Sequence, residues 1–335
     1  MVSHEELLQH YTELVEEGVA SYFQSHMREY DYHPFMARVY SQMAEYLGRG
    51  GKRLASASTL IAYKGYTGSL DERIKEVAVG IEMYRHSILA HDDLVDRDDH
   101  RRGGRALHKL HDGRLGEAVA IFAGNMMYAL ALEIFMNSGF GEDLKQRVVK
   151  LFTREYAEVN ESQILDVHFE GAKPTEGEWY SMAAKRAASL FKSTILAGAV
   201  FGEAGERDIL TLREAAENIG YAFDIQDDII GTFASEEQYG RPVGGDVALR
   251  KKPLHVVYAL ERSTEEEARI LEGGDIKGAM DVIRSTGGLD MAKTRSREHA
   301  AKARELLKKT SMDAESKEFF YGFIEYVSES LEWYV

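Results

Sequence analysis

Apolar residues recur at steps of three and four along most of this chain, which is the period of one face of an α-helix. The period predicts helices over residues 5–30, 35–46, 116–135, 142–166 and 179–202. It continues through residues 254–335, with breaks at the glycine pairs 273–274 and 287–288. Residues 234–252 lack it and predict a long loop, which in a compact domain is usually functional. The pattern therefore predicts an all-α fold, a single large helical bundle that forms one domain over residues 1–335.

One predicted helix changes from apolar to acidic at its end. Its inward face carries Ile74, Val77, Ile81, Tyr84, Ile88, Asp92 and Asp96. Neighbouring carboxylates on a buried face repel each other and need a cation. Oxygen ligands suit Mg²⁺, and the guanidinium groups of the following Arg101 and Arg102 match phosphate oxygens. The segment therefore predicts a site for Mg²⁺ and a phosphorylated ligand.

A second acidic segment strengthens this prediction. Taken alone, a D-D-x-x-D run is more often a solvated helix end than a functional site. The run F-D-I-Q-D-D-I-I-G at Phe223–Gly231 again ends an apolar helical stretch, and lysines follow it. Earlier in the chain, Gly50-Gly51-Lys52-Arg53 opens a helix with a glycine turn and two cations, an arrangement that can bind an anion.

Composition narrows the class of protein. The chain has 335 residues, 44% hydrophobic content and only four prolines, which favours helix. It has no cysteine, so disulfides and thiolate metal sites are excluded and a reducing cytoplasm fits. A net charge of −15 argues against nucleic acid as a partner. We see no continuous apolar run of about eighteen residues, so no membrane span is expected. Histidines cluster near the first acidic segment, but hydrogen-bonding roles suit them better than zinc ligation.

Taken together, the motifs resemble the trans-isoprenyl diphosphate synthase family, the polyprenyl synthetases that include farnesyl and geranylgeranyl diphosphate synthases. The blocks that carry the resemblance are G-G-K-R, D-D-L-V-D, R-R-G, S-Q-I-L-D (Ser162–Asp166), Q-D-D-I-I-G, Y-G-R-P-V-G-G-D (Tyr239–Asp246) and R-K-K (Arg250–Lys252). The resemblance implies an isoprenoid synthase bundle with a central cavity flanked by two aspartate-rich helices. It also implies a cytoplasmic homodimer.

The reaction implied by the resemblance is the head-to-tail, trans condensation of isopentenyl diphosphate with an allylic diphosphate, which would be dimethylallyl, geranyl or farnesyl diphosphate. By resemblance, Asp92, Asp96 and Asp227 would hold three Mg²⁺ ions, or Mn²⁺ in their place, with Asp93 and Asp228 in support. Arg101 would contact the allylic diphosphate, and Lys52, Arg53 and Arg102 the isopentenyl diphosphate. The remaining residues expected to bind substrate are Arg85, Gln163, Lys185, Arg186, Asp224, Arg241 and Lys251.

The chain departs from the family pattern at several of these positions. Ala55 stands where the family has an arginine, and Arg85 stands where it has histidine or glutamine. We expect that the positive charge has moved from position 55 to position 85, so that isopentenyl diphosphate is still bound. Alternatively, Arg85 pairs with a nearby carboxylate such as Glu82, and Lys52, Arg53 and Arg102 suffice for binding. Arg186 takes a lysine position, with Lys185 as the alternative cation, and Asp224 and Arg241 replace a glutamine and a lysine.

Product length should depend on the helix that ends in the first acidic segment. In the family the growing chain runs beside this helix, and bulky residues on it form a floor. Ser87 and Ile88 precede Asp92, and Tyr84 lies about one turn deeper, or about 5 Å. A floor at Tyr84 predicts geranylgeranyl diphosphate, with a twenty-five-carbon product as the next candidate. Alternatively, Tyr84 is only a core residue and another helix forms the floor.

Two other functions remain compatible with the sequence. The same Mg²⁺ and diphosphate chemistry would serve a class I terpene synthase-like or irregular prenyl-coupling enzyme. A non-catalytic regulatory subunit would share the fold, although its acidic clusters would then have no use.

Overall fold

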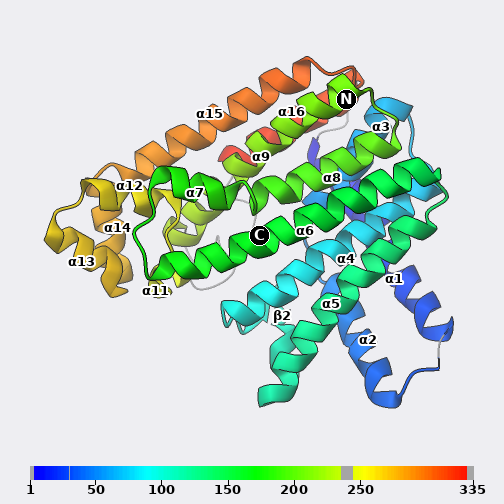
Figure 1. Ribbon diagram of the computed structural model, residues 1–335, viewed down its shortest axis with the longest axis horizontal. Helices are drawn as coiled ribbons and strands as arrows, with labels where there is room; N and C mark the ends of the chain where they lie inside the picture. Colours follow the sequence, from blue (N-terminus) through cyan, green and yellow to red (C-terminus); the bar gives the residue numbers. More distant parts are fainter. Residues whose placement is uncertain (1–3, 30, 235–243, 330–335) are drawn as a thin grey trace. The chain divides into compact units, whose positions relative to one another are not determined.

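The computed structural model describes residues 4–29, 31–234 and 244–329 (Figure 1). Its elements, in chain order, are α1 (His4–Glu29), α2 (Pro34–Gly48), α3 (Leu54–Thr67), α4 (Glu72–Val95), β1 (His100–Arg101), β2 (Gly104–Arg105), η1 (Leu107–Lys109), α5 (Gly113–Asn137), α6 (Glu142–Glu170), α7 (Glu176–Ala183), α8 (Ala187–Phe201), α9 (Glu206–Phe233), α11 (Gly245–Ala248), α12 (Leu254–Arg262), α13 (Glu265–Gly273), α14 (Ile276–Ser285), α15 (Gly288–Lys308) and α16 (Ala314–Glu329). The predicted all-α class is confirmed.

The chain forms two compact units. The first comprises Met1–Phe152, Thr194–Ala204 and Met312–Ser316, and the second comprises Thr153–Ser193, Gly205–Ser311 and Lys317–Val335. The boundary falls within α6, α8 and α16, so three helices contribute residues to both units. The expectation of one domain over residues 1–335 stays a prediction.

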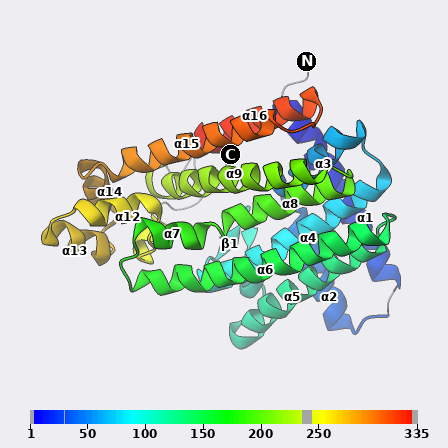
Figure 2. The ribbon, with the colours of Figure 1, turned by 45° about the horizontal axis from the view of Figure 1, so that its top comes forward.

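Helix α4 is the centre of the first unit. It packs along α5 and also contacts α3 and α1 (Figures 1 and 2). Gly80 allows the close approach to α5, since a Cβ atom there would lie 2.6 Å from Cε1 of Phe135. Nearly all of α4 before its last turn is buried, including polar residues on several of its faces. The helix that carries the first acidic segment is therefore enclosed by protein on most sides.

A β-hairpin follows α4, and the helical period of the sequence does not reveal it. Strand β1 pairs antiparallel with β2, with His100 opposite Arg105 and Arg101 opposite Gly104. The two turn residues, Arg102 and Gly103, both have positive φ, at 49° and 74°. Two such residues form the type I′ turn that suits a two-residue hairpin. The R-R-G-G-R sequence therefore folds back on itself immediately beside the acidic helix end.

In the second unit, α9 and α15 lie side by side (Figure 2). The core beneath them includes Trp179 of α7, Ile225 and Ile229 of α9, and Leu254 and Tyr258 of α12. The second acidic segment occupies the last turns of α9, so this core fixes the helix that carries it.

Most predicted helices are confirmed to within a few residues at each end, and the glycine breaks end α13 and α14 as expected. The continuous helix predicted over residues 179–202 is wrong. Helix α7 ends at Ala183 and α8 begins at Ala187. Between them, the Lys185 N–H donates to the Met182 carbonyl three residues back, so the chain turns more tightly than an α-helix. The long predicted loop also contains the short helix α11.

Helix α5 qualifies one expectation about membranes. Within the described part of the chain, it is the one helix with the length and apolar composition to cross a membrane, and half of the qualifying stretch is buried in the fold. A core helix of a water-soluble protein passes the same test. Because half of the stretch is buried in the fold, the composition of α5 alone does not indicate a membrane span.

Candidate active site

The first acidic cluster (Asp92, Asp93 and Asp96) ends α4, where Asp96 is the C-cap. The sequence predicts that Asp92 and Asp96 face inward, but the fully buried member is Asp93. Tyr46 Oη donates to its Oδ2 at 2.7 Å, and Arg101 Nε donates to its Oδ1 at 2.6 Å. Burial raises the pKa of Asp93, although Arg101 opposes that effect. Asp92 and Asp96 are half-buried at the helix end, a position suited to ligating a cation.

Arg101 is held by this cluster. Its Nη2 also donates to Asp92 Oδ2 at 3.4 Å and lies 3.7 Å from Asp98. The sequence suggested that Asp92 is unpaired, but in the structure it accepts a hydrogen bond from Arg101. Burial would lower the pKa of Arg101, but Asp93 and Asp92 outweigh it and raise the pKa.

The hairpin is held against the turn before α3 by close packing on glycine. The guanidinium group of Arg102 lies against Gly51, where an added Cβ would come within 2.8 Å of Cζ. Arg49 Nη1 donates to the Arg101 carbonyl at 3.1 Å, and the Arg49 guanidinium packs against Gly104. The G-G-K-R and R-R-G-G-R motifs are thus adjacent in space, which brings Lys52 and Arg102 to the same part of the first unit.

Arg53 is placed differently from the expectation for a substrate ligand. It caps α3 with a positive φ of 47°, and the residue is only 3% exposed. Its Nη1 donates to Glu82 Oε2 at 2.9 Å, and its Nη2 donates to the Arg49 carbonyl at 2.9 Å. Burial alone would raise the pKa of Glu82, but Arg53 and neighbouring groups lower it to about 2. Diphosphate binding by Arg53 stays a prediction, and in this structure its side chain points into the fold.

His86 was not among the expected site residues, yet it contacts two arginines of the first unit. It is 1% exposed, and its Nε2 lies 3.2 Å from Nη1 of Arg102 and 3.5 Å from Nη1 of Arg53. The helical period already puts His86 on α4. Its neighbours on α3 and in the hairpin depend on tertiary packing, so no local signal identifies them.

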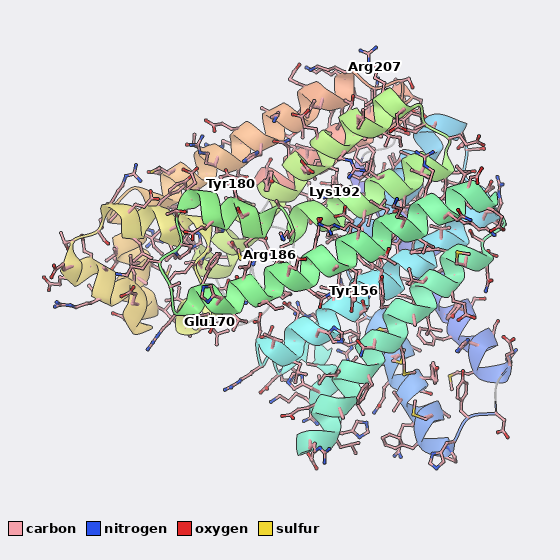
Figure 3. All side chains as sticks on the ribbon, viewed as in Figure 1. Tyr156, Glu170, Tyr180, Arg186, Lys192 and Arg207 are labelled. Atoms are coloured by element: carbon pink, nitrogen blue, oxygen red, sulfur yellow. The ribbon has the colours of Figure 1, made fainter. Side chains whose placement is uncertain are left out.

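In the second unit, Arg186 lies in the turn between α7 and α8 (Figure 3). Its Nε and Nη2 donate to the two carboxylate oxygens of Asp224, each at 2.9 Å, and its Nη1 donates to Asp166 at 3.2 Å. Burial would lower the pKa of Arg186, but Asp224, Asp166 and Asp228 raise it well above its usual value. Two expected substrate residues, Arg186 and Asp224, thus form a forked ion pair with each other.

The second acidic cluster (Asp224, Asp227 and Asp228) includes one buried carboxylate oxygen without a hydrogen bond from the described residues. Asp228 Oδ2 is buried and lies 3.7 Å from Arg186 Nη2. Burial raises the pKa of Asp228 well above its usual value. Asp227 is half-buried beside it. An orphaned carboxylate oxygen among oxygen-only ligands fits a hard divalent cation such as Mg²⁺.

The other expected residues of the second unit have the following places. Lys251 Nζ lies 3.3 Å from Asp166 Oδ2 and 3.9 Å from Asp246, a carboxylate that the sequence analysis did not assign. Lys185 pairs with Glu161 near the surface, a different partner from those of Arg186. Gln163 is half-buried on α6. Arg241 lies outside the described residues.

The predicted product-length residues lie deep in the first unit. Tyr84 is fully buried, with its ring 4.7 Å from that of Phe152 and 6.4 Å from that of Tyr128. Ser87 Oγ donates to the Tyr84 carbonyl at 2.7 Å, and Ile88 is 7% exposed. Phe152 was not an expected product-length residue, because α6 is distant from α4 in the chain. Tyr84 therefore belongs to an aromatic layer formed by three helices.

Solved structures of prenyl diphosphate synthases share this fold. Geranylgeranyl pyrophosphate synthetase from Pyrococcus horikoshii OT3 gives a TM-score of 0.85 at 25% identity, covering 97% of this chain and 99% of that protein. Geranylgeranyl pyrophosphate synthase from Corynebacterium glutamicum, solved with isoprenyl diphosphate and magnesium, gives 0.89 at 21% identity, covering 95% and 98%. With its two acidic clusters, the fold defines an all-α enzyme of the prenyl diphosphate synthase class.

Sequence relatives identify the family. The profile of the family described as Polyprenyl synthetase matches residues 37–277. The short chain isoprenyl diphosphate synthase of Methanocaldococcus jannaschii is 31% identical over 257 residues, which are 74% of this chain and 76% of that protein. The chain belongs to the polyprenyl synthetase family and is a prenyltransferase, as its motifs predict.

Proposed function

We propose that this enzyme condenses isopentenyl diphosphate with an allylic diphosphate, head to tail and in trans configuration, to give geranylgeranyl diphosphate. The observation that carries the proposal is the pair of acidic clusters, each with a guanidinium group bound to it: Arg101 on Asp93 and Arg186 on Asp224. A carboxylate cluster that also holds an arginine presents both of the partners that a metal-bound diphosphate needs.

We assign the metal to the half-buried carboxylates. In the proposal, Asp92, Asp96 and Asp227 would hold three Mg²⁺ ions. Mn²⁺ would fit the same oxygen ligands. When bound, the cation neutralises negative charge that develops on the departing diphosphate. The Corynebacterium glutamicum enzyme, whose structure includes magnesium and isoprenyl diphosphate, is consistent with this assignment.

The protein's own groups position the leaving group and exclude water. Arg101 is fixed by Asp93 and Asp92 before substrate arrives, so little side-chain freedom is lost when it binds the allylic diphosphate. Lys251, beside Asp166 in the second unit, would bind diphosphate in the proposal. The buried apolar residues of α4 below Asp92 provide a dry surface, which protects a carbocation from attack by water.

In the proposal, the depth at which Tyr84 lies below Asp92 determines the length of the product. Ser87, one turn below Asp92, has a small side chain. Tyr84 lies one turn further down, and its large ring packs against Phe152. One helical turn is about 5 Å, close to one isoprene unit. A floor at this depth favours geranylgeranyl diphosphate over a fifteen-carbon product.

We further propose a cytoplasmic homodimer that binds no nucleic acid and does not span a membrane. Helix α5 exposes large apolar side chains, the most exposed being Phe122 at 63%, together with Leu115, Ile121 and Met136. Apolar side chains gathered on one helix are typical of a protein interface. A second copy of the chain that covers this face would remove it from water.

A terpene synthase-like or irregular coupling enzyme is the second candidate, because the inward position of Arg53 and the loss of arginine at Ala55 both reduce the expected isopentenyl diphosphate site. A diphosphate-release assay separates the two functions. The proposal predicts release from geranyl or farnesyl diphosphate only when isopentenyl diphosphate is present. Release from the allylic substrate alone would favour the second candidate, and no release in either case would contradict both.

A further inference from the structure

The buried His86 imidazole has a fixed tautomer. Its Nδ1 lies 2.8 Å from the Glu82 carbonyl oxygen, which can only accept a hydrogen bond, so Nδ1 carries the hydrogen. Nε2 then has a free lone pair. Burial and the positive charge of Arg102 lower the pKa of His86 to about 3, so the ring is neutral near neutral pH.

Two guanidinium groups approach this one lone pair. Arg102 Nη1 donates to Nε2 at 3.2 Å, and Arg53 Nη1 lies 3.5 Å from it. The buried carboxylate of Glu82 is already engaged, since it accepts from Arg53 at 2.9 Å and from Ser56 Oγ at 2.6 Å. Arg53 therefore has a carboxylate partner in the core, and Arg102 has a neutral one.

A neutral acceptor orients a cation without cancelling its charge. A carboxylate in place of His86 would bind Arg102 more strongly, but it would compete with any incoming anion for the same guanidinium group. The guanidinium of Arg102 packs on Gly51, although the residue as a whole is exposed. Burial, with a smaller effect of the nearby Arg53, Arg85 and Arg101, lowers the pKa of Arg102 to about 10, and Glu82 opposes this shift.

We propose that His86 is a positioning residue of the isopentenyl diphosphate site: its neutral imidazole fixes the Arg102 guanidinium against Gly51 and leaves the full positive charge available to a diphosphate. The inference rests on the proposed function, in which Arg102 binds isopentenyl diphosphate. It adds a role for His86, which acts only through the arginine.

Equilibrium binding tests the inference independently of turnover. Isothermal titration of isopentenyl diphosphate in EDTA isolates the arginine site from any metal. We expect His86→Leu to weaken binding about ten- to a hundredfold, the range for one charge-assisted hydrogen bond, and His86→Gln, which keeps an acceptor, to restore most of the affinity. His255→Leu, which removes a buried neutral histidine of the second unit, is the matched control and should bind like the wild type. His86→Phe replaces the leucine variant if that protein does not fold.

A double-variant comparison separates positioning from a general structural effect. If His86 acts through Arg102, adding His86→Leu to Arg102→Ala weakens binding no further. In turnover assays the apparent KM for isopentenyl diphosphate should rise in His86→Leu, while the allylic KM changes little. Equal affinity in His86→Leu and wild type, or fully additive losses, would overturn the inference. A wild-type protein that binds isopentenyl diphosphate without turning it over would contradict the proposed function alone.

Discussion

Arg101 and Asp93 are bonded to each other, with Arg101 Nε 2.6 Å from Asp93 Oδ1, although one was expected to bind substrate and the other to support metal. Asp93 is fully buried and Arg101 is half-buried, so the pair anchors the hairpin to the end of α4. The same guanidinium reaches Asp92 at 3.4 Å. Asp92 therefore lies next to a cation even without a metal, and its role in metal binding must be separated from its role in holding Arg101.

We expect Asp92→Ala and Asp227→Ala each to lower kcat by at least about two orders of magnitude, because each removes a proposed ligand of a cation that stabilises the leaving diphosphate. Steady-state kinetics at saturating Mg²⁺ measures the loss. Asp99→Ala is the control, since Asp99 is exposed and pairs with Lys109 rather than with the acidic clusters. Near-normal turnover in either Asp92 or Asp227 variants would remove the metal assignment.

The exchange of charge between positions 55 and 85 gives a second prediction. Arg85 is half-buried on α4, and the nearby Glu82 carboxylate accepts hydrogen bonds from Arg53 and Ser56. We expect Arg85→His to raise the apparent KM for isopentenyl diphosphate about ten- to a hundredfold and to leave the allylic KM nearly unchanged.

Adding Ala55→Arg to Arg85→His should recover most of that loss, which a double-mutant cycle measures as a coupling energy. Ala55 is buried in the first turn of α3, so the thermal stability of each variant must be measured alongside. Unchanged isopentenyl diphosphate kinetics in Arg85→His, or purely additive effects of the two substitutions, would argue against the exchange.

Product length gives a third prediction. Tyr84→Ala should shift the products from twenty towards twenty-five carbons, as resolved by chromatography, because it opens the turn below Ser87. Removing a buried aromatic ring costs about 3–5 kcal/mol of stability, so the assay should be run well below the melting temperature. Tyr84→Phe keeps the ring and should keep the product length. If Tyr84→Ala leaves the distribution unchanged, Phe152 or another residue of the aromatic layer forms the floor.

Buried histidines make the protein sensitive to acid. Burial lowers the pKa of His255 to about 3, against 6.5 when unfolded. Below pH 6.5 the unfolded chain therefore binds a proton that the native state does not, so stability falls as pH falls from 7.5 to 5.5. The expected contribution of this histidine is about 1.4 kcal/mol over that interval.

Urea unfolding at the two pH values checks this prediction. His255→Gln keeps an acceptor for Thr232, which lies 3.1 Å from His255 Nε2, and should reduce the pH dependence by about 1.4 kcal/mol. His168→Gln, at an exposed position of α6, should retain the wild-type pH dependence. The same slope in His255→Gln as in the wild type would contradict the assignment.

The helical class, most helix positions and the two acidic segments could be predicted from the sequence, because hydrophobic period and capping act between residues close in the chain. The prediction of the elements failed at two short turns, which are too short to change the hydrophobic period. A tight turn near Lys185 divides one predicted helix, and a two-residue turn at Arg102-Gly103 forms a hairpin. Both features direct arginines towards carboxylates.

Which side chains pair with one another was decided only by the tertiary structure. The sequence determined that Arg53 follows a glycine pair, that Arg101 follows an acidic segment and that Arg186 takes a lysine position of the family. Tertiary packing alone decided that Arg53 donates to the buried Glu82 and that Arg186 donates to Asp224. The physical reason is that burial makes an unpaired charge very costly, so each buried arginine takes the partner that the fold brings within reach, however distant it is in the chain.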